Sequence, residues 1–102
     1  MSRWLGDVYK RQLKLSADPS GALKFDTDKL DAKAGKVTIT MDNPSPVPHA
    51  VEVEGNGVEK ASKTLTQGKA SVTVDLKAGK YEFYCPVDGH KQAGMKGTLT
   101  VG

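Results

Sequence analysis

The sequence predicts an all-β protein, built as a Greek-key sandwich or barrel of seven to eight strands. Apolar and polar residues alternate with a period of two along most of the chain, which is typical of strands with one buried face. Clusters of Gly, Pro, Asp and Asn separate these segments and indicate turns. No stretch of a dozen residues has a helical period. The long crossovers that parallel strands need are therefore missing, and we expect antiparallel pairing.

The predicted strands are short, and each has one apolar face. They span residues 13–16, 23–26, 37–41, 49–54, an edge strand within 58–68, 72–76, 81–85 and a last segment that contains Leu99 and Val101. Residues 27–34 are rich in Asp and Lys and are interpreted as a loop or a short helical turn. Met41 is expected in the core. Tyr81 is expected to hydrogen-bond to the backbone as a tyrosine corner.

Residues 1–12 have no strand or helix period, and we interpret them as a non-native or mobile leader before a domain that spans residues 13–102. The alternative is an amphipathic anchor with Trp4, Leu5 and Val8 on one face, although twelve residues are too few for a stable helix in water. The segment also lacks the apolar stretch of a secretory signal, so export would require that a signal had been removed.

The composition excludes several classes of protein. With 37% hydrophobic and 26% charged residues, and no apolar run of about 18 residues, the chain is neither disordered nor inserted in a membrane by a helix. The net charge is +3, and two of these charges belong to residues 1–12. No basic run interleaves with aromatic residues, so nucleic-acid binding is not expected.

Residues 85–95 contain the only cysteine, one of the two histidines and a methionine, which are Cys85, His90 and Met95. Their side chains offer a thiolate, an imidazole and a thioether. This combination suits copper better than magnesium or calcium, which prefer carboxylate and carbonyl oxygens. The segment is therefore the first candidate for a metal site.

The local sequence explains how one loop could bring these side chains together. Cys85 lies at the end of an alternating strand, on its apolar face, and Pro86 stops that strand. Gly89 and Gly94 each precede a proposed ligand and let the backbone turn sharply.

A fourth ligand is expected from His49, the only other histidine. It follows residues 43–48, in which three prolines within five residues stiffen the chain into an extended loop. Alternation with Val51 and Val53 places the His49 side chain on the apolar face. Two imidazoles, a thiolate and a weak axial methionine form the ligand set of a blue-copper electron-transfer site.

Three other interpretations stay open at this point. Cys85 and His90 could act as an enzymatic nucleophile and base, although no oxyanion arrangement is evident and Met95 would have no role. Structural zinc would need four strong ligands, and a thioether is a poor fourth. Copper delivery or storage without an electron-transfer partner is the third alternative. Fast, reversible redox cycling without loss of metal would distinguish an electron carrier from it.

The upstream Pro48-His49 pair and the Cys-x4-His-x4-Met spacing that begins at Cys85 resemble the cupredoxin family of small blue-copper proteins. The resemblance covers about residues 13–102. It implies a cupredoxin-like Greek-key fold, one type 1 copper ion, and a periplasmic or extracellular one-electron carrier that is not an enzyme. The metal ligands that it implies are three equatorial residues and one axial residue, namely His49, Cys85 and His90, with Met95 as the axial ligand.

Ala50 departs from the family pattern, because cupredoxins usually have asparagine after the first histidine ligand. That asparagine braces the cysteine loop, so this side-chain brace is absent here. Pro86 has no N–H, which leaves the amides of Ala50 and Val87 as the predicted hydrogen-bond donors to the Cys85 sulfur.

Redox partner proteins are expected to dock near His90, on a monomer that is not permanently inserted in a membrane. The small apolar residues around the loop favour this surface, since the transient interfaces of redox partners are small. The residues expected at its rim are Pro46, Val47, Pro48, Pro86, Val87, Ala93 and Gly94.

Overall fold

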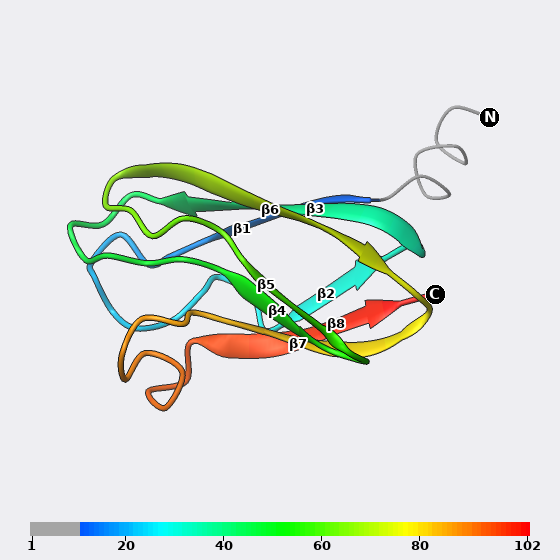
Figure 1. Cartoon of the computed structure of the whole chain (residues 1–102). Coiled ribbons are helices and arrows are strands. Elements are labelled where there is room, and N and C mark those ends of the chain that lie inside the picture. The colour runs from blue at the N-terminus through cyan, green and yellow to red at the C-terminus, as the bar shows by residue number, and fades with distance from the viewer. Residues whose placement is uncertain (1–10) are drawn as a thin grey trace.

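The computed structural model describes residues 11–102 as two β-sheets that face each other, with no helix among these residues (Figure 1). The first sheet has the strand order β1-β3-β6, and the second has the order β2-β8-β7-β4-β5. The strands are β1 Gln12–Ser16, β2 Lys29–Ala32, β3 Gly35–Asn43, β4 Glu52–Gly55, β5 Val58–Ala61, β6 Gly68–Leu76, β7 Gly79–Tyr84 and β8 Lys96–Val101. The predicted all-β sandwich of seven to eight strands is confirmed. In the part of the chain that the structure describes, no helix has the length and apolar character needed to cross a membrane.

The core lies between the two sheets and follows directly from the alternation in the sequence. Every second residue of β3 points inward, and Val37, Ile39 and Met41 are all 0% exposed. Phe83 from β7 and Leu99 from β8 meet them from the opposite sheet, and both are also fully buried. Burying one such side chain contributes about 1.5–3 kcal/mol. The expected core position of Met41 is confirmed.

The expectation of purely antiparallel pairing is wrong. β1 pairs with β3 in parallel, with Leu13 opposite Ile39, and β2 pairs with β8 in parallel, with Leu30 opposite Leu99. No helical crossover is needed, because the chain first forms a strand of the other sheet and then returns to pair with its parallel partner. Between β1 and β3, for example, it forms β2 of the facing sheet. The remaining pairs, such as β3 with β6 and β7 with β8, are antiparallel.

Two local predictions before β3 also need correction. Residues 23–26 do not form a strand, because only Phe25 is buried there and it makes a single antiparallel bridge with Ala17. Residues 27–34, interpreted as a loop or helical turn, contain β2. Its inward residues, Leu30 and Ala32, are only two and are embedded among charged neighbours, so their alternation is too short to be recognised in the sequence. The edge strand predicted within 58–68 is confirmed as β5.

The folded domain includes Arg11 and Gln12, which were assigned to the leader. Gln12 begins β1, and Arg11 Nε donates a hydrogen bond of 2.9 Å to the Ala34 carbonyl oxygen. The Thr38 N–H also donates to the Arg11 carbonyl oxygen at 2.7 Å. The rest of the predicted leader, including the anchor residues of the alternative interpretation, lies outside the described residues.

The turn between β6 and β7 is closed by Tyr81. Its hydroxyl donates a hydrogen bond of 2.8 Å to the Lys77 carbonyl oxygen, four residues earlier. The ring itself is 4% exposed and packs in the core. The predicted tyrosine corner is therefore confirmed.

Candidate metal centre

The loop between β7 and β8 is tied together by its own backbone. The Cys85 N–H donates to the Met95 carbonyl oxygen at 3.0 Å, and the Met95 N–H donates to the His90 carbonyl oxygen at 3.1 Å. Gly89 and Gly94 have φ angles of 80° and 110°, which residues with a Cβ rarely adopt. The loop thus closes on itself as the sequence predicts, with Cys85 and Met95 side by side at its base.

His49 reaches the same end of the sandwich from the connection between β3 and β4. It forms an isolated bridge with Leu65, in which the His49 N–H donates to the Leu65 carbonyl oxygen at 3.1 Å and the His49 carbonyl oxygen accepts the Leu65 N–H at 3.0 Å. The His49 side chain is 0% exposed, as its place in the apolar alternation predicts.

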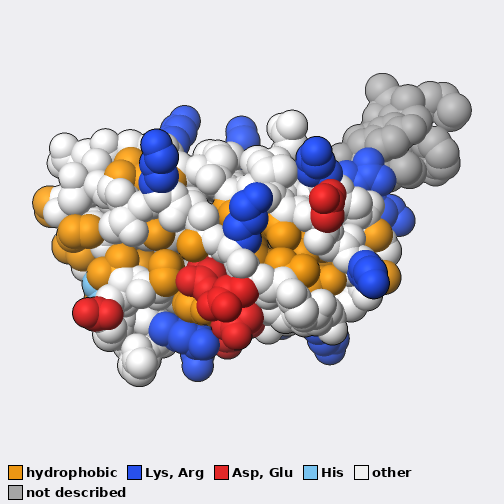
Figure 2. Space-filling model, viewed as in Figure 1, with side chains coloured by type: hydrophobic (Ala, Val, Ile, Leu, Met, Phe, Trp, Pro, Cys, Tyr) orange, Lys and Arg blue, Asp and Glu red, His pale blue; other side chains and the backbone are white. Residues whose placement is uncertain are grey.

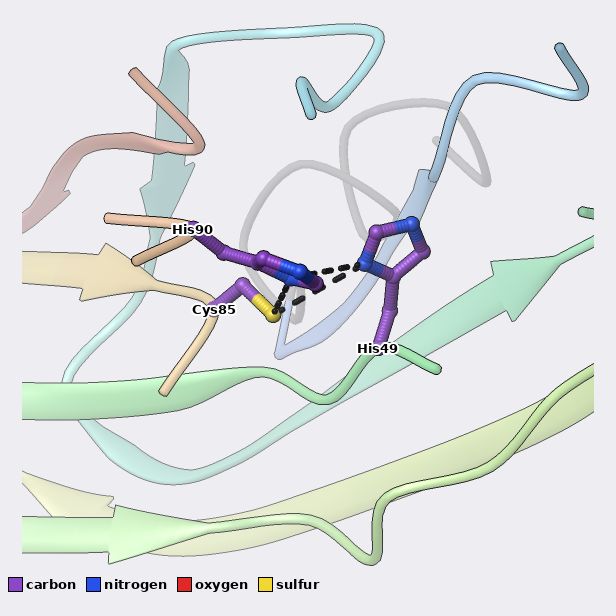
Figure 3. Close-up of side chains that lie close together, drawn as sticks. All are labelled: His49, Cys85 and His90. Carbon is purple, nitrogen blue, oxygen red and sulfur yellow. Dashed lines mark hydrogen bonds between the residues drawn. The ribbon is translucent and has the colours of Figure 1, made fainter. Parts of the chain in front are cut away.

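Three of the four predicted ligands meet in one buried cluster (Figure 3). His49 Nδ1 lies 3.3 Å from His90 Nδ1 and 3.8 Å from Cys85 Sγ, and Cys85 Sγ lies 3.3 Å from His90 Nδ1. A point equidistant from three atoms with these separations is about 2 Å from each of them. Zinc, as a typical first-row metal, makes bonds of about 2.0–2.3 Å to imidazole nitrogen and thiolate sulfur. The three donor atoms are therefore spaced to hold one such ion.

Met95, the fourth predicted residue, is 0% exposed, and its backbone makes hydrogen bonds to the backbones of Cys85 and His90. Among residues 11–102, no carboxylate joins the mutually close group of His49, Cys85 and His90. A structural zinc ion would thus lack its usual fourth strong ligand. The donor set of two imidazoles, one thiolate and a buried thioether in the same loop fits copper.

Burial controls the protonation of the donors. Burial raises the pKa of the Cys85 thiol, and hydrogen bonds from the backbone amides of Ala50 and Val87 to the sulfur act in the opposite direction. These are the two donors that the sequence predicts. Burial, and then the neighbouring His90, lower the pKa of His49. His49 therefore stays neutral and able to bind a metal to lower pH than a free histidine does.

The burial of Cys85 argues against the enzymatic alternative. Its side chain is 0% exposed, and the sulfur is enclosed by both histidines and two backbone amides. A nucleophilic thiolate must reach a substrate atom directly. The sulfur is placed to contact a small ion and not a substrate.

A second polar cluster, which the sequence did not predict, surrounds the Tyr84 hydroxyl. This hydroxyl lies 2.8 Å from a carboxylate oxygen of Glu52 and 2.8 Å from one of Glu54. Lys91 lies over the Tyr84 ring, 4.1 Å from its centroid, and pairs with Glu82 at 2.9 Å. Figure 2 shows a patch of acidic side chains over β4 and β5 beside a cationic group. Only the strand register, which places Glu52 opposite Tyr84, brings these groups together.

Replacing Glu59 with glutamine is expected to stabilise the protein at neutral pH. Glu59 completes this acidic cluster on the neighbouring strand β5, and a hydrogen bond to Glu52, followed by the charges of Glu52 and Glu54, raises its pKa above the usual 4.5. A raised pKa in the folded state contributes stability at low pH, and this contribution is lost as the pH rises through that pKa. The Glu59→Gln variant avoids this loss.

Thermal unfolding of both proteins between pH 3.5 and 8 measures this effect. The variant should unfold at a higher temperature at pH 7, and the difference should vanish toward the acid end. Lys60→Gln, an exposed neighbour on β5, serves as a control for the loss of a charge. A difference between Glu59→Gln and the parent that did not depend on pH would contradict the prediction.

Comparison with known proteins agrees with this geometry. Residues 12–102 match the family described as copper binding proteins of the plastocyanin/azurin family. Plastocyanin from Scenedesmus fuscus is 33% identical over 98 residues, which cover 87% of this chain and 96% of that protein.

Solved structures show the same fold. Dithionite-reduced auracyanin from Roseiflexus castenholzii superposes with a TM-score of 0.80 at 21% identity, covering 90% of this chain and 97% of that one. Auracyanin A from Chloroflexus aurantiacus, a blue copper protein, gives a TM-score of 0.75 at 22% identity over 89% of this chain and 98% of its own. With the family match over nearly all described residues, these findings confirm the resemblance, and the chain belongs to the plastocyanin/azurin family of copper-binding cupredoxins.

Proposed function

We propose that this protein is a type 1 blue-copper electron carrier that passes one electron at a time between redox partner proteins. The observation that supports this most directly is the buried triangle of His49 Nδ1, Cys85 Sγ and His90 Nδ1, with sides of 3.3 to 3.8 Å. In this proposal these three residues are the equatorial ligands, and Met95 is the axial one. When bound, copper supplies the one-electron change between Cu(II) and Cu(I).

The role of the protein is to keep its ligands in place while the charge of the site changes. Cys85 and Met95 are joined by a backbone hydrogen bond at the base of the loop, and His49 is paired with Leu65. The amides of Ala50 and Val87 donate to the Cys85 sulfur. Groups that are already oriented need little rearrangement when an electron arrives or leaves, which favours fast transfer over a reaction with bound substrate.

Electrons are proposed to enter and leave through the His90 edge. His90 is 8% exposed, whereas His49 and Cys85 are both 0% exposed, so the His90 ring is the nearest ligand to solvent. Exposed Pro48, Pro86 and Ala93 lie in the loops beside it. Figure 2 shows apolar side chains gathered at the end of the molecule where the loops after β3 and β7 lie in Figure 1. A partner with a small apolar contact surface would fit here.

The proposed place of work is the periplasm or the extracellular space, with the protein acting as a monomer. The burial of the free Cys85 thiol supports the proposed compartment indirectly. A lone thiol is a liability in an oxidising compartment, but Cys85 is fully buried and a metal would occupy it. Membership of a family that includes plastocyanin supports the same location.

Addition of Cu(II) to the purified protein tests the proposal. One equivalent should produce an intense visible band from charge transfer between thiolate and metal, and voltammetry should show a fast, reversible one-electron couple. Absence of the band would overturn the type 1 assignment. A slow couple with ready loss of Cu(I) to a chelator would instead indicate copper delivery or storage.

Replacing Met95 with leucine is expected to keep the band and raise the reduction potential. Leucine matches methionine in size and stays buried, but it offers no thioether to stabilise the oxidised ion. Voltammetry of parent and variant measures the shift. Met41→Leu, which changes a fully buried methionine of the β3 core, is the matched control and should leave the potential nearly unchanged. Equal potentials for Met95→Leu and the parent would show that Met95 is not the axial ligand.

A further inference from the structure

The His49 ring has no hydrogen bond on the side that points away from the cluster. Its Nδ1 faces Cys85 and His90, whereas its Nε2 is buried and has no hydrogen-bond partner among the described residues. Metal-binding histidines usually donate this second N–H to a carboxylate or a carbonyl, which fixes the orientation of the ring. Ala50, the next residue, has no polar side chain. The position of the His49 ring therefore depends on how its backbone is held.

The segment before His49 has few hydrogen-bond donors of its own. Three of residues 44–48 are prolines and carry no N–H, so only the amides of Ser45 and Val47 remain. The Ser45 N–H donates to Asn43 Oδ1 at 3.0 Å, and the Val47 N–H donates to Ser45 Oγ at 3.2 Å. Both amides are thus bound by side chains and not by a neighbouring strand.

Asn43 is the centre of this network and uses all of its hydrogen-bonding capacity. It is the last residue of β3 and is 0% exposed. Its Oδ1 accepts from the N–H and the hydroxyl of Ser45, at 3.0 and 2.8 Å. Its Nδ2 donates to the carbonyl oxygens of Val47 and Leu65, both at 2.8 Å. An amide side chain has two donors and two acceptor positions, so buried Asn43 is fully satisfied.

The Leu65 carbonyl is the point where this network meets His49. The same oxygen accepts the His49 N–H at 3.1 Å and Asn43 Nδ2 at 2.8 Å. Asn43 therefore joins the end of β3, the proline-rich loop and the segment opposite His49 into one unit.

We infer that Asn43 is a positioning residue of the metal centre, which sets the place of His49 Nδ1 through the Val47 and Leu65 carbonyls. The residue does not touch the metal. This inference rests on the proposed function, because it assumes that His49 is a copper ligand.

The test is the Asn43→Ser variant. Serine keeps a short side-chain oxygen that can accept from the Ser45 N–H, but it loses both amide donors to Val47 and Leu65. Thr38→Ala is the matched control, because it removes another side-chain hydrogen bond of β3, the 2.9 Å contact with Thr73, earlier in the same strand. Hydrogen exchange is measured on the metal-free proteins, and the visible band and the reduction potential are measured after copper is added.

The His49 and Leu65 amides should exchange at least about tenfold faster in Asn43→Ser, relative to the amide of Ile39 in the same strand, because their local opening becomes easier. The copper form should show a shifted or broadened band and a changed potential. Thr38→Ala should change none of these ratios. If Asn43→Ser behaves like Thr38→Ala in exchange, band and potential, the inference is wrong.

A second measurement decides the matter if Asn43→Ser does not fold. In the unmodified metal-free protein, the two side-chain amide protons of Asn43 should exchange slowly and at rates similar to the His49 amide, and fast exchange would overturn the inference. The two proposals fail differently. A parent protein that binds copper without the visible band contradicts the proposed function, whereas a blue parent with an unaffected Asn43→Ser variant contradicts only the role of Asn43.

Discussion

Replacing Cys85 with serine is expected to abolish the intense visible band of the copper protein. Cys85 is the only cysteine, and its sulfur lies 3.3 Å from His90 Nδ1 and 3.8 Å from His49 Nδ1. The band requires a thiolate bound to the metal. A serine hydroxyl has nearly the same shape but stays protonated and is a hard, weak donor, so the remaining imidazoles would bind Cu(II) without this transition.

Visible absorbance during a Cu(II) titration of the parent and the Cys85→Ser variant measures the loss of the band. NMR spectra of the backbone amides check that the variant is folded. Because the substitution changes one atom, the core should be preserved. Ser62→Ala is a useful control, since it removes the hydroxyl that accepts the N–H of Val51, two residues after His49. It leaves all four proposed ligands in place. It should retain the band. A band of undiminished intensity in Cys85→Ser would exclude the thiolate as a ligand.

Replacing Gly97 with alanine is expected to lower the free energy of unfolding by about 3 kcal/mol, near the upper end of the usual cost of overpacking. Gly97 lies opposite Phe83 in the pairing of β7 and β8. A Cβ at this position would overlap the Phe83 ring and the Asp28 carbonyl oxygen. The ring is fully buried, and the Asp28 oxygen accepts the Thr98 N–H at 2.9 Å, so neither is free to move aside.

Denaturant unfolding of the metal-free proteins measures this change. Thr100→Ala is the matched control, because Thr100 is exposed on the same strand and its truncation should cost no more than about 0.5 kcal/mol. Equal stability of Gly97→Ala and the parent would show that β8 can shift away from Phe83, which would contradict the close packing described here.

The shape of the loop that holds Cys85, His90 and Met95 could be predicted from the sequence because its determinants are local. Cys85 ends an alternating strand, Pro86 stops it, and glycine precedes His90 and Met95, so a few residues define the turn. His49 could be added because no other histidine exists. The donors to the sulfur were also predictable. Pro86 has no N–H, which left Ala50 and Val87, and both amides bind the sulfur in the structure.

The features that the sequence did not predict depend on contacts between distant segments. The parallel pairs arise because successive strands belong to different sheets. The local alternation of apolar and polar residues contains no information about which sheet a strand joins. β2 has only two inward residues, so its strand character comes from its partner β8. The cluster around Tyr84 requires the register of β4 and β7, and the hold of Asn43 on Leu65 requires a contact across 22 positions.

The parallel pairing of β2 with β8 has a consequence for the order of events in folding. β8 pairs with β2 on one side and with β7 on the other, and β2 lies far earlier in the chain. Pairings of this kind carry a high cost of loop closure, and all-β domains rich in them fold over milliseconds to seconds. The loop that holds Cys85, His90 and Met95 gains its second fixed end only when β8 docks. We therefore expect the cluster of His49, Cys85 and His90 to form among the last steps of folding. The metal ion would then bind to a domain that has already folded and would not direct its folding.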